Sequence, residues 1–145
     1  MTLPVTGLAA AICALLLIYC AYATVRQRLA SQIGFGDGDN PDLLTARRIH
    51  ANLSEHAPIF LIMLGVLELA NAHHFGLTTI TALFLVGRVA HIVGMNQHHK
   101  GGSPRFRQLG VITTWLTMAA LALWILFLFA TMHIYGGRVI REVFP

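Results

Sequence analysis

Three polar side chains in the polar first part of one long helical pattern in this 145-residue sequence have the types and spacing that binding chemistry requires. Arg48, Asn52 and Glu55 fall within an arc of about 60° on a helix, so a cation, an amide and a carboxylate share one face. Such a face can hold a ligand, or it can be a solvated surface at the polar end of a long helix. Spacing alone does not separate these two interpretations.

A second polar group lies further along the chain, in an apolar segment. Arg88, His91 and Met95 also fall within about 60° on a helix. Ionisable residues inside membrane segments are costly and commonly pair with one another, so we expect Arg88 to have a carboxylate partner. Glu55 and Glu68 are both candidates, each offset in depth from Arg88 by roughly 9 to 11 Å at the helical rise, and geometry does not choose between them.

These residue types indicate the kind of ligand. Several arginines at one membrane edge suit a ligand with carboxylates or phosphate, because guanidinium groups form paired hydrogen bonds with them. A nearby carboxylate can then hold an ammonium group. A small zwitterion with two carboxylates and one amine meets both demands, and glutathione is one molecule of that description. The surrounding lipid would supply an apolar second substrate.

The composition indicates where these residues must be positioned. Apolar residues make up 56% of the chain and charged residues 11%, whereas ordinary soluble domains carry roughly 25% charged residues. This excludes a disordered chain and argues against a soluble domain or a nucleic-acid-binding module. The excess of ten Lys and Arg over six Asp and Glu therefore reflects membrane topology better than binding to nucleic acid.

Four apolar segments predict an all-α integral membrane four-helix bundle in a single domain, residues 1–145. The expected helices cover about 5–25, 42–72, 77–95 and 108–135. The first apolar run has 21 residues without a charge. A cleaved signal peptide is the alternative, but no Lys or Arg precedes the run and it exceeds the usual apolar length of about 7 to 15 residues, so we favour a retained helix.

Capping residues and glycines predict where the helices begin, end and pack closely. Asn40 can cap a helix that starts with Pro41 and Asp42. Gly136-Gly137 is expected to end the fourth helix. Gly87 and Gly94, seven residues apart on the third helix, are expected to allow close contact with a neighbouring helix.

Positive charges predict the orientation in the membrane. The segments that follow the first and third helices contain seven cationic residues, against two near the C-terminus. Because cytoplasmic loops are enriched in Lys and Arg, we expect the loops between the first and second and between the third and fourth helices to be cytoplasmic, with both termini on the opposite side. The residues counted are Arg26, Arg28, Arg47, Arg48, Lys100, Arg105 and Arg107, against Arg138 and Arg141.

No metal site is predicted. The histidine pairs His73-His74 and His98-His99 lack the i, i+4 spacing that places two imidazoles on one helical face. The acidic loop that begins at Asp37 lacks the glycine and glutamate that a calcium loop needs at its sixth and twelfth positions. Cys13 and Cys20 lie two turns apart on one helix and are expected to be separate buried thiols.

Two motifs now resemble a known family. Arg48-Ile-His-Ala-Asn52-Leu-Ser-Glu55-His-Ala-Pro58 is similar to the second-helix motif R-x3-N-x2-E-x2-P of the MAPEG family, the membrane-associated proteins in eicosanoid and glutathione metabolism. The stretch from Leu83 to His91 resembles the third helix of its microsomal prostaglandin E synthase branch. With Val25-Arg26-Gln27-Arg28 closing the first helix and Arg107 opening the fourth, the likeness covers nearly the whole chain.

The resemblance implies a homotrimer that holds glutathione, a co-substrate, between adjacent subunits near the cytoplasmic face. Glu55 then becomes the favoured partner of Arg88. Arg107 matches the arginine that stabilises the glutathione thiolate, because an adjacent guanidinium favours the charged form of a thiol. The residues that the resemblance assigns to the glutathione pocket are Arg26, Arg48, Asn52, Glu55, Arg88 and His91.

The sequence also departs from the family pattern. Met95 replaces a tyrosine one turn after His91, His56 replaces an aromatic residue, and Gln108 replaces a serine that follows the catalytic arginine in the prostaglandin branch. Glutathione binding is compatible with these changes, but prostaglandin synthesis is not inferred from them.

Three classes of function follow. The first is a glutathione transferase or peroxidase that acts on lipophilic electrophiles or lipid hydroperoxides, with Arg107 as its catalytic residue. The second is a non-catalytic lipid-binding or scaffold protein of the same fold, which the loss of the tyrosine at Met95 fits. The third, a small transport or channel subunit, has little support because broken helices are not indicated. The expected partners are further copies of the chain, membrane lipid and a lipophilic small molecule.

Overall fold

The chain forms four long helices and no strand in the part that the computed structural model describes, residues 2–143, with side chains described up to residue 134. They are α1 (Pro4–Ser31), α2 (Pro41–Leu69), α3 (His74–His99) and α4 (Arg105–Val143). Each is long and apolar enough to cross a membrane. The predicted all-α, four-helix membrane architecture is therefore confirmed.

The beginning of α2 and the end of α4 differ in how closely they follow the local sequence signals. Asn40 caps α2 as expected, because its side-chain oxygen accepts a hydrogen bond from the Leu43 amide at 3.0 Å. The fourth helix differs from the prediction, since it continues through Gly136 and Gly137 to Val143. Glycine costs only about 1 kcal/mol relative to alanine in a helix and, unlike proline, removes no donor. The basic side chains of the expected tail, Arg138 and Arg141, lie outside the described side chains.

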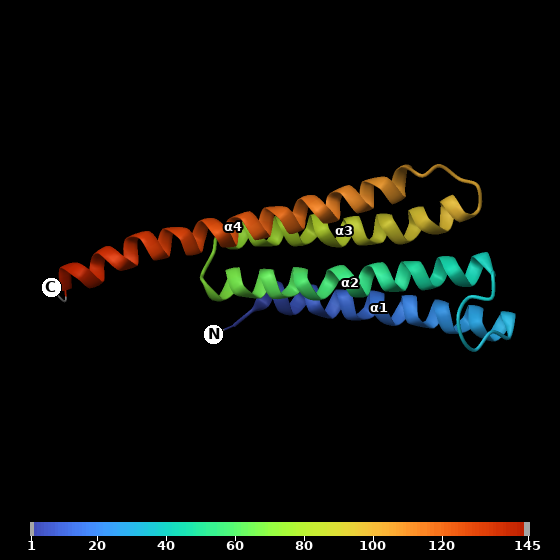
Figure 1. Cartoon of the computed structure of the whole chain (residues 1–145). Helices are drawn as coiled ribbons and strands as arrows, with labels where there is room; N and C mark the ends of the chain where they lie inside the picture. Colours follow the sequence, from blue (N-terminus) through green and yellow to red (C-terminus); the bar gives the residue numbers. More distant parts are fainter. Residues whose placement is uncertain (1, 144–145) are drawn as a thin grey trace.

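The helices are arranged as two hairpins (Figure 1). α1 packs chiefly on α2, and α3 chiefly on α4, with α2 and α3 joining the two hairpins. The loops after α1 and α3 lie at the same end of the bundle, whereas the short connection between α2 and α3 lies at the other end. This topology brings the polar ends of all four helices together.

The centre of the bundle is apolar and aromatic. Phe60 of α2 stacks on Phe84 of α3 with ring centroids 3.7 Å apart and planes within 6°. Both rings are fully buried. Cys13 and Cys20 on α1 are buried free thiols, as the sequence predicts. These contacts fix the rotation of α2 and α3 and thereby the direction in which their polar faces point.

Glu68, at the end of α2, caps the beginning of α1. Its two carboxylate oxygens accept hydrogen bonds from the backbone amides of Val5 at 2.9 Å and Thr6 at 2.8 Å. The first amides of a helix have no partner within the helix and carry partial positive charge. The carboxylate of Glu68 on α2 therefore accepts hydrogen bonds from amides at the start of α1 that have no partner within the helix. These bonds also hold α1 and α2 together at the end of the hairpin opposite its loop.

Glycines allow α3 and α4 to approach closely. A Cβ on Gly94 would lie 2.7 Å from Arg107 Cα, and one on Gly110 would lie 2.6 Å from the His91 backbone nitrogen. A Cβ on Gly87 would lie 3.1 Å from the side chain of Thr113. The prediction that Gly87 and Gly94 mark a close helix contact is confirmed, and Gly110 supplies the matching glycine on α4.

Candidate functional site

A polar cavity of about 350 Å³ opens between α2, α3 and α4 at the end of the bundle that carries the longer loops. This volume lies within the range of about 300 to 1,000 Å³ that is usual for small-ligand sites. The cavity combines two guanidinium groups, a carboxylate, an amide and an imidazole. Its lining includes Arg48, Asn52, Glu55, His91, Met95 and Arg107.

One wall of this cavity is formed by residues of α2 that share a face of the helix. Arg48, Asn52 and Glu55 line it together, as their helical spacing predicts. Arg48 and Glu55 are exposed and Asn52 is half-buried. The charged ends of this face are thus accessible to a ligand, while its central amide is held within the protein.

Arg88 lies behind the cavity wall and fixes Asn52. Only 2% of its surface is exposed. Its Nη1 donates a hydrogen bond to Asn52 Oδ1 at 2.8 Å and a longer one to the Asn52 carbonyl at 3.5 Å. The guanidinium carbon also lies 5.9 Å from the centroid of the Phe84 ring, within the range of a cation–π contact.

The prediction that Arg88 pairs with a carboxylate is wrong. Within the described side chains Arg88 forms no ion pair with Glu55 or Glu68. Glu55 is directed to the exposed cavity, and Glu68 is engaged at the start of α1. The two neutral oxygens of Asn52 accept hydrogen bonds from the guanidinium instead. Arg88 Nε has no hydrogen-bond partner among the described residues.

The close contact between α3 and α4 positions the remaining groups. Arg107 lies in the first turn of α4, against Gly94, and is half-buried. His91 is 5% exposed and lies against Gly110. Both residues line the cavity with Met95. The close contacts at Gly94 and Gly110 thus place the guanidinium of Arg107 in the same cavity as the polar face of α2.

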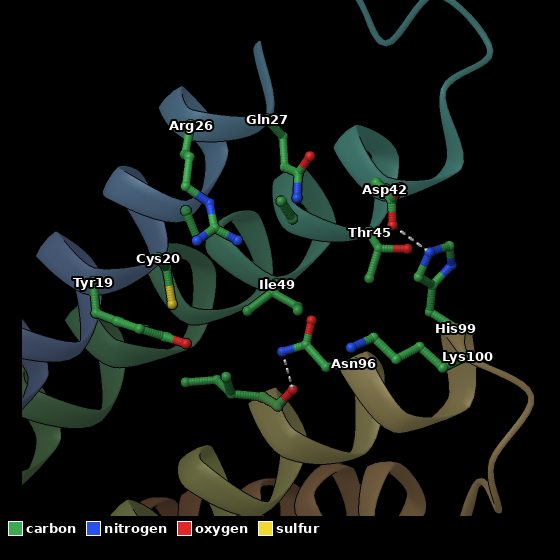
Figure 2. Close-up of a pocket in the computed structure, with 13 residues that line it drawn as sticks. Tyr19, Cys20, Arg26, Gln27, Asp42, Thr45, Ile49, Asn96, His99 and Lys100 are labelled. Carbon is green, nitrogen blue, oxygen red and sulfur yellow. Dashed lines mark hydrogen bonds and ion pairs between the residues drawn. The ribbon is translucent and has the colours of Figure 1, made fainter. Parts of the chain in front are cut away.

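Arg26 is placed elsewhere. It lines a smaller cavity of about 160 Å³ between α1, α2 and α3, together with Lys100, Asp42 and His99. His99 Nε2 is hydrogen-bonded to Asp42 Oδ1 at 2.7 Å (Figure 2). Within one chain the structure therefore separates Arg26 from the other predicted residues. Sequence spacing gave no signal for Lys100 and His99, although the predicted common end of the two loops could have suggested them.

The chemistry of the larger cavity is that of an anion and zwitterion site. Arg48 and Arg107 can each donate paired hydrogen bonds to a carboxylate or phosphate, and Glu55 can accept from an ammonium group. In the described part of the chain, no group of three or more His, Cys, Asp or Glu side chains is arranged to hold a metal ion. The side chains that line the cavity can bind both charges of a zwitterionic ligand.

Comparison with known proteins agrees with this architecture. The model of the MAPEG family matches residues 6–127. The chain is also similar to the inner membrane protein YecN of Escherichia coli K12, with 32% identity over 119 residues, which cover 82% of this chain and 88% of YecN. The YecN protein of Escherichia coli O6:H1 strain CFT073 matches with the same identity and coverage. The four membrane-spanning helices, the polar cavity and these matches together show that the chain belongs to the MAPEG family.

Proposed function

We propose that the cavity between α2, α3 and α4 binds glutathione and that the protein is a membrane glutathione transferase or peroxidase acting on lipophilic electrophiles or lipid hydroperoxides. One observation carries the proposal: Arg48, Asn52 and Glu55 of α2 and Arg107 of α4 line a single cavity of about 350 Å³. Their charges complement the two carboxylates and one ammonium group of the tripeptide.

Each residue has a role in this proposal. Arg48 binds a glutathione carboxylate, and Glu55 binds the ammonium group. Asn52 donates its amide N–H to the peptide, since its oxygen is already bound to Arg88 at 2.8 Å. Arg88 is thus a positioning residue.

Arg107 acts on the thiol. A guanidinium beside the sulfur favours the thiolate over the thiol, and the thiolate is the nucleophile. In the transferase reaction, the thiol proton leaves to solvent, and the thiolate sulfur forms a bond to an electrophilic carbon of a substrate that arrives from the lipid. The bond from that carbon to its leaving group breaks, and the leaving group departs to solvent as an anion with the electron pair of that bond. His91 bounds the pocket on the α3 side.

We also propose that the chain works as a homotrimer with both longer loops in the cytoplasm. Large apolar side chains remain exposed along α1 and α4, including Leu15, Tyr22, Leu116 and Leu126, and such faces suit lipid or further copies of the chain. Arg26 lines a separate cavity in its own chain, so it would reach glutathione only from a neighbouring copy. The cationic loops at one end support the orientation.

Glutathione titration tests the binding site directly. Isothermal titration calorimetry of the detergent-purified protein should show a saturable heat that S-hexylglutathione displaces. Arg48→Ala and Glu55→Ala should each weaken binding by about tenfold or more, because a hydrogen bond to a charged group contributes roughly 1.5 to 3 kcal/mol. Arg105→Ala is the matched control, since Arg105 is an exposed cation at the start of α4 that does not line the cavity. Absence of heat and of competition would exclude the proposal.

Turnover distinguishes an enzyme from a silent binder. With a generic aryl electrophile, the wild-type protein should form the glutathione conjugate and Arg107→Ala should lose most of this activity. The second candidate, a non-catalytic lipid-binding protein, rests on Met95, which lines the cavity and cannot donate the hydrogen bond that a tyrosine would. Glutathione binding without turnover that depends on Arg107 would favour this candidate.

A further inference from the structure

A further cavity lies at the end of the bundle opposite the proposed glutathione site. It has a volume of about 300 Å³ and lies between residues 4–8 of α1 and residues 74–85 of α3. Figure 1 shows that the beginning of α1 and the short connection between α2 and α3 lie at this same end. Most of the cavity surface is apolar, and Val5, Leu8 and Leu85 contribute to it. The volume is at the lower end of the usual range for small ligands, about 300 to 1,000 Å³.

Three hydrogen-bonding side chains of α3 line this cavity. His74, Thr78 and Thr81 are separated by four and three residues, which places them on successive turns of one helical face. Ala82 and Leu85 continue the lining further along α3. The cavity is therefore polar near the α2–α3 connection and apolar further into the bundle. A ligand with a polar group at one end and an apolar chain at the other matches this arrangement.

The hydroxyl of Thr81 has no hydrogen-bond partner within the described part of the chain. Thr81 is 6% exposed, and its Oγ1 is buried. Thr78 and Thr79 of the same helix differ, because their hydroxyls donate to the carbonyls of His74 at 2.9 Å and Phe75 at 2.8 Å. Buried polar groups are normally hydrogen-bonded. Since no bond holds the Thr81 hydroxyl and threonine populates two χ1 rotamers in helices, this group can turn toward a ligand in the cavity.

The charges around the cavity favour a neutral ligand. Among the described residues that line it there is no Asp, Glu, Lys or Arg, and burying a charged group without a partner is costly. Glu68 binds the amide of Val5 at 2.9 Å, and Val5 lines the cavity. A carboxylate is therefore already present at this end of the bundle, and it repels an anionic headgroup.

The cavity opens toward the membrane. Leu8 of α1 is 66% exposed, and Ala82 of α3 is also exposed. Both helices are apolar enough to cross a membrane, so a ligand reaches the cavity from the hydrocarbon. We propose that this cavity binds a neutral lipid, whose acyl chain lies along Leu8, Ala82 and Leu85 and whose hydroxyl or ester oxygen is hydrogen-bonded to Thr81.

The neutral-lipid site does not depend on glutathione binding. The two cavities share no lining residue among those that the structure describes. Along α3, Thr81 precedes His91 by ten residues, which corresponds to about 15 Å at the helical rise. The lipid is thus a ligand separate from the lipophilic substrate of the proposed transferase reaction, which must reach Arg107. Conjugation of glutathione to a generic aryl electrophile should be unchanged in Thr81→Val, so the two proposals fail separately.

Lipid binding to the full chain in detergent tests the proposal. Native mass spectrometry measures the affinity for monooleoylglycerol and for oleate, which has the same acyl chain and an ionised headgroup at about pH 8. Thr81→Val removes the hydroxyl and keeps the branched shape, and Ala82→Phe fills the cavity. Thr79→Val is the matched control, since Thr79 lies on the same helix and does not line the cavity. Thermal unfolding followed by circular dichroism, with and without lipid, measures the stability of each variant.

We expect the wild type to bind monooleoylglycerol more tightly than oleate. Thr81→Val should lower the affinity for monooleoylglycerol about fivefold, because it removes one neutral hydrogen bond. Ala82→Phe should lower it about tenfold or more, because the ring occupies the space of the acyl chain, and Thr79→Val should change it less than about twofold. Without lipid, Thr81→Val should unfold at the same temperature as the wild type or higher, because valine removes a buried hydroxyl that has no partner. Added lipid should then raise the unfolding temperature of the wild type more than that of Thr81→Val.

Three results would overturn the proposal. Oleate that binds as tightly as monooleoylglycerol would show that the site does not select a neutral headgroup. Equal losses in Thr81→Val and Thr79→Val, or failure of monooleoylglycerol to bind the wild type, would show that the Thr81 cavity is not the binding site. If Ala82→Phe changes the oligomeric mass and leaves lipid binding unaltered, the cavity is a contact between copies of the chain.

Discussion

Replacing Gly94 with alanine should force α3 away from the start of α4. The new Cβ would lie 2.6 Å from the Phe106 carbonyl carbon and 2.7 Å from Arg107 Cα, whereas carbon atoms in contact are about 3.5 to 4.0 Å apart. These neighbours are backbone atoms, so no side-chain rotation relieves the collision. The first turn of α4, which carries Arg107, must therefore move by about 1 Å.

The cost follows from two opposing effects. Overpacking costs about 1 to 3 kcal/mol, and we use the upper value because the collision involves backbone. Alanine in place of glycine returns about 1 kcal/mol through its higher helix propensity. The net loss of stability is about 2 kcal/mol. For a chain of this size, 1 kcal/mol corresponds to about 2 to 4 °C in Tm, so the unfolding temperature should fall by about 4 to 8 °C.

Gly65→Ala is the matched control for this prediction. A Cβ at Gly65 would lie 3.7 Å from Thr6 Cγ2, an ordinary contact, so this variant should be unchanged or slightly more stable. Thermal unfolding followed by circular dichroism in detergent provides the comparison. If the variants at Gly94 and Gly65 unfold at the same temperature, the close contact between α3 and α4 is refuted. On the proposed function, a displacement of Arg107 by about 1 Å should also lower conjugation on the order of 100-fold.

Two further substitutions test contacts within the bundle. Glu68→Gln replaces a charged acceptor with a neutral one at the start of α1, and it should cost about 1 kcal/mol; hydrogen exchange at the Val5 and Thr6 amides should become faster, and unchanged exchange would contradict the cap. Asn52→Leu removes the oxygen that receives the buried Arg88 side chain and should cost about 3 kcal/mol. The double variant Asn52→Leu/Arg88→Leu should recover part of this loss in a double-mutant cycle of thermal unfolding, whereas additive losses would show that the two residues are not coupled.

Much of the fold could be predicted because membrane helices follow directly from the length and composition of apolar runs. The sequence predicts all four helices and the cap at Asn40. It places several helix ends too early, because α1 and α3 continue through polar residues, 26–31 and 96–99, past the apolar segments that predict them. The interruption expected at Gly136 is absent from the backbone of α4, since a glycine weakens a helix without blocking it.

The candidate site was predictable where it depends on one helix and not where it depends on two. Arg48, Asn52 and Glu55 share a face because helical periodicity requires it. The partner of Arg88 depends on how α3 is rotated against α2, which the sequence does not encode in any local spacing. Arg26 has the residue type expected for an anion site, but the packing of α1 on α2 directs it to a different cavity.

The carboxylate of Glu68 has a practical consequence for handling the protein. Deleting the residues up to and including Thr6 would remove both amides that this carboxylate binds. The Glu68 carboxylate would then lie near the hydrocarbon without these hydrogen-bond donors. Placing a charge there without a hydrogen-bond partner costs free energy. An affinity tag joined ahead of Thr2 keeps both donors in place. Shortened versions of the chain should therefore retain Val5 and Thr6, and poor expression of versions that lack them would reflect a lost helix start rather than a lost signal for membrane insertion.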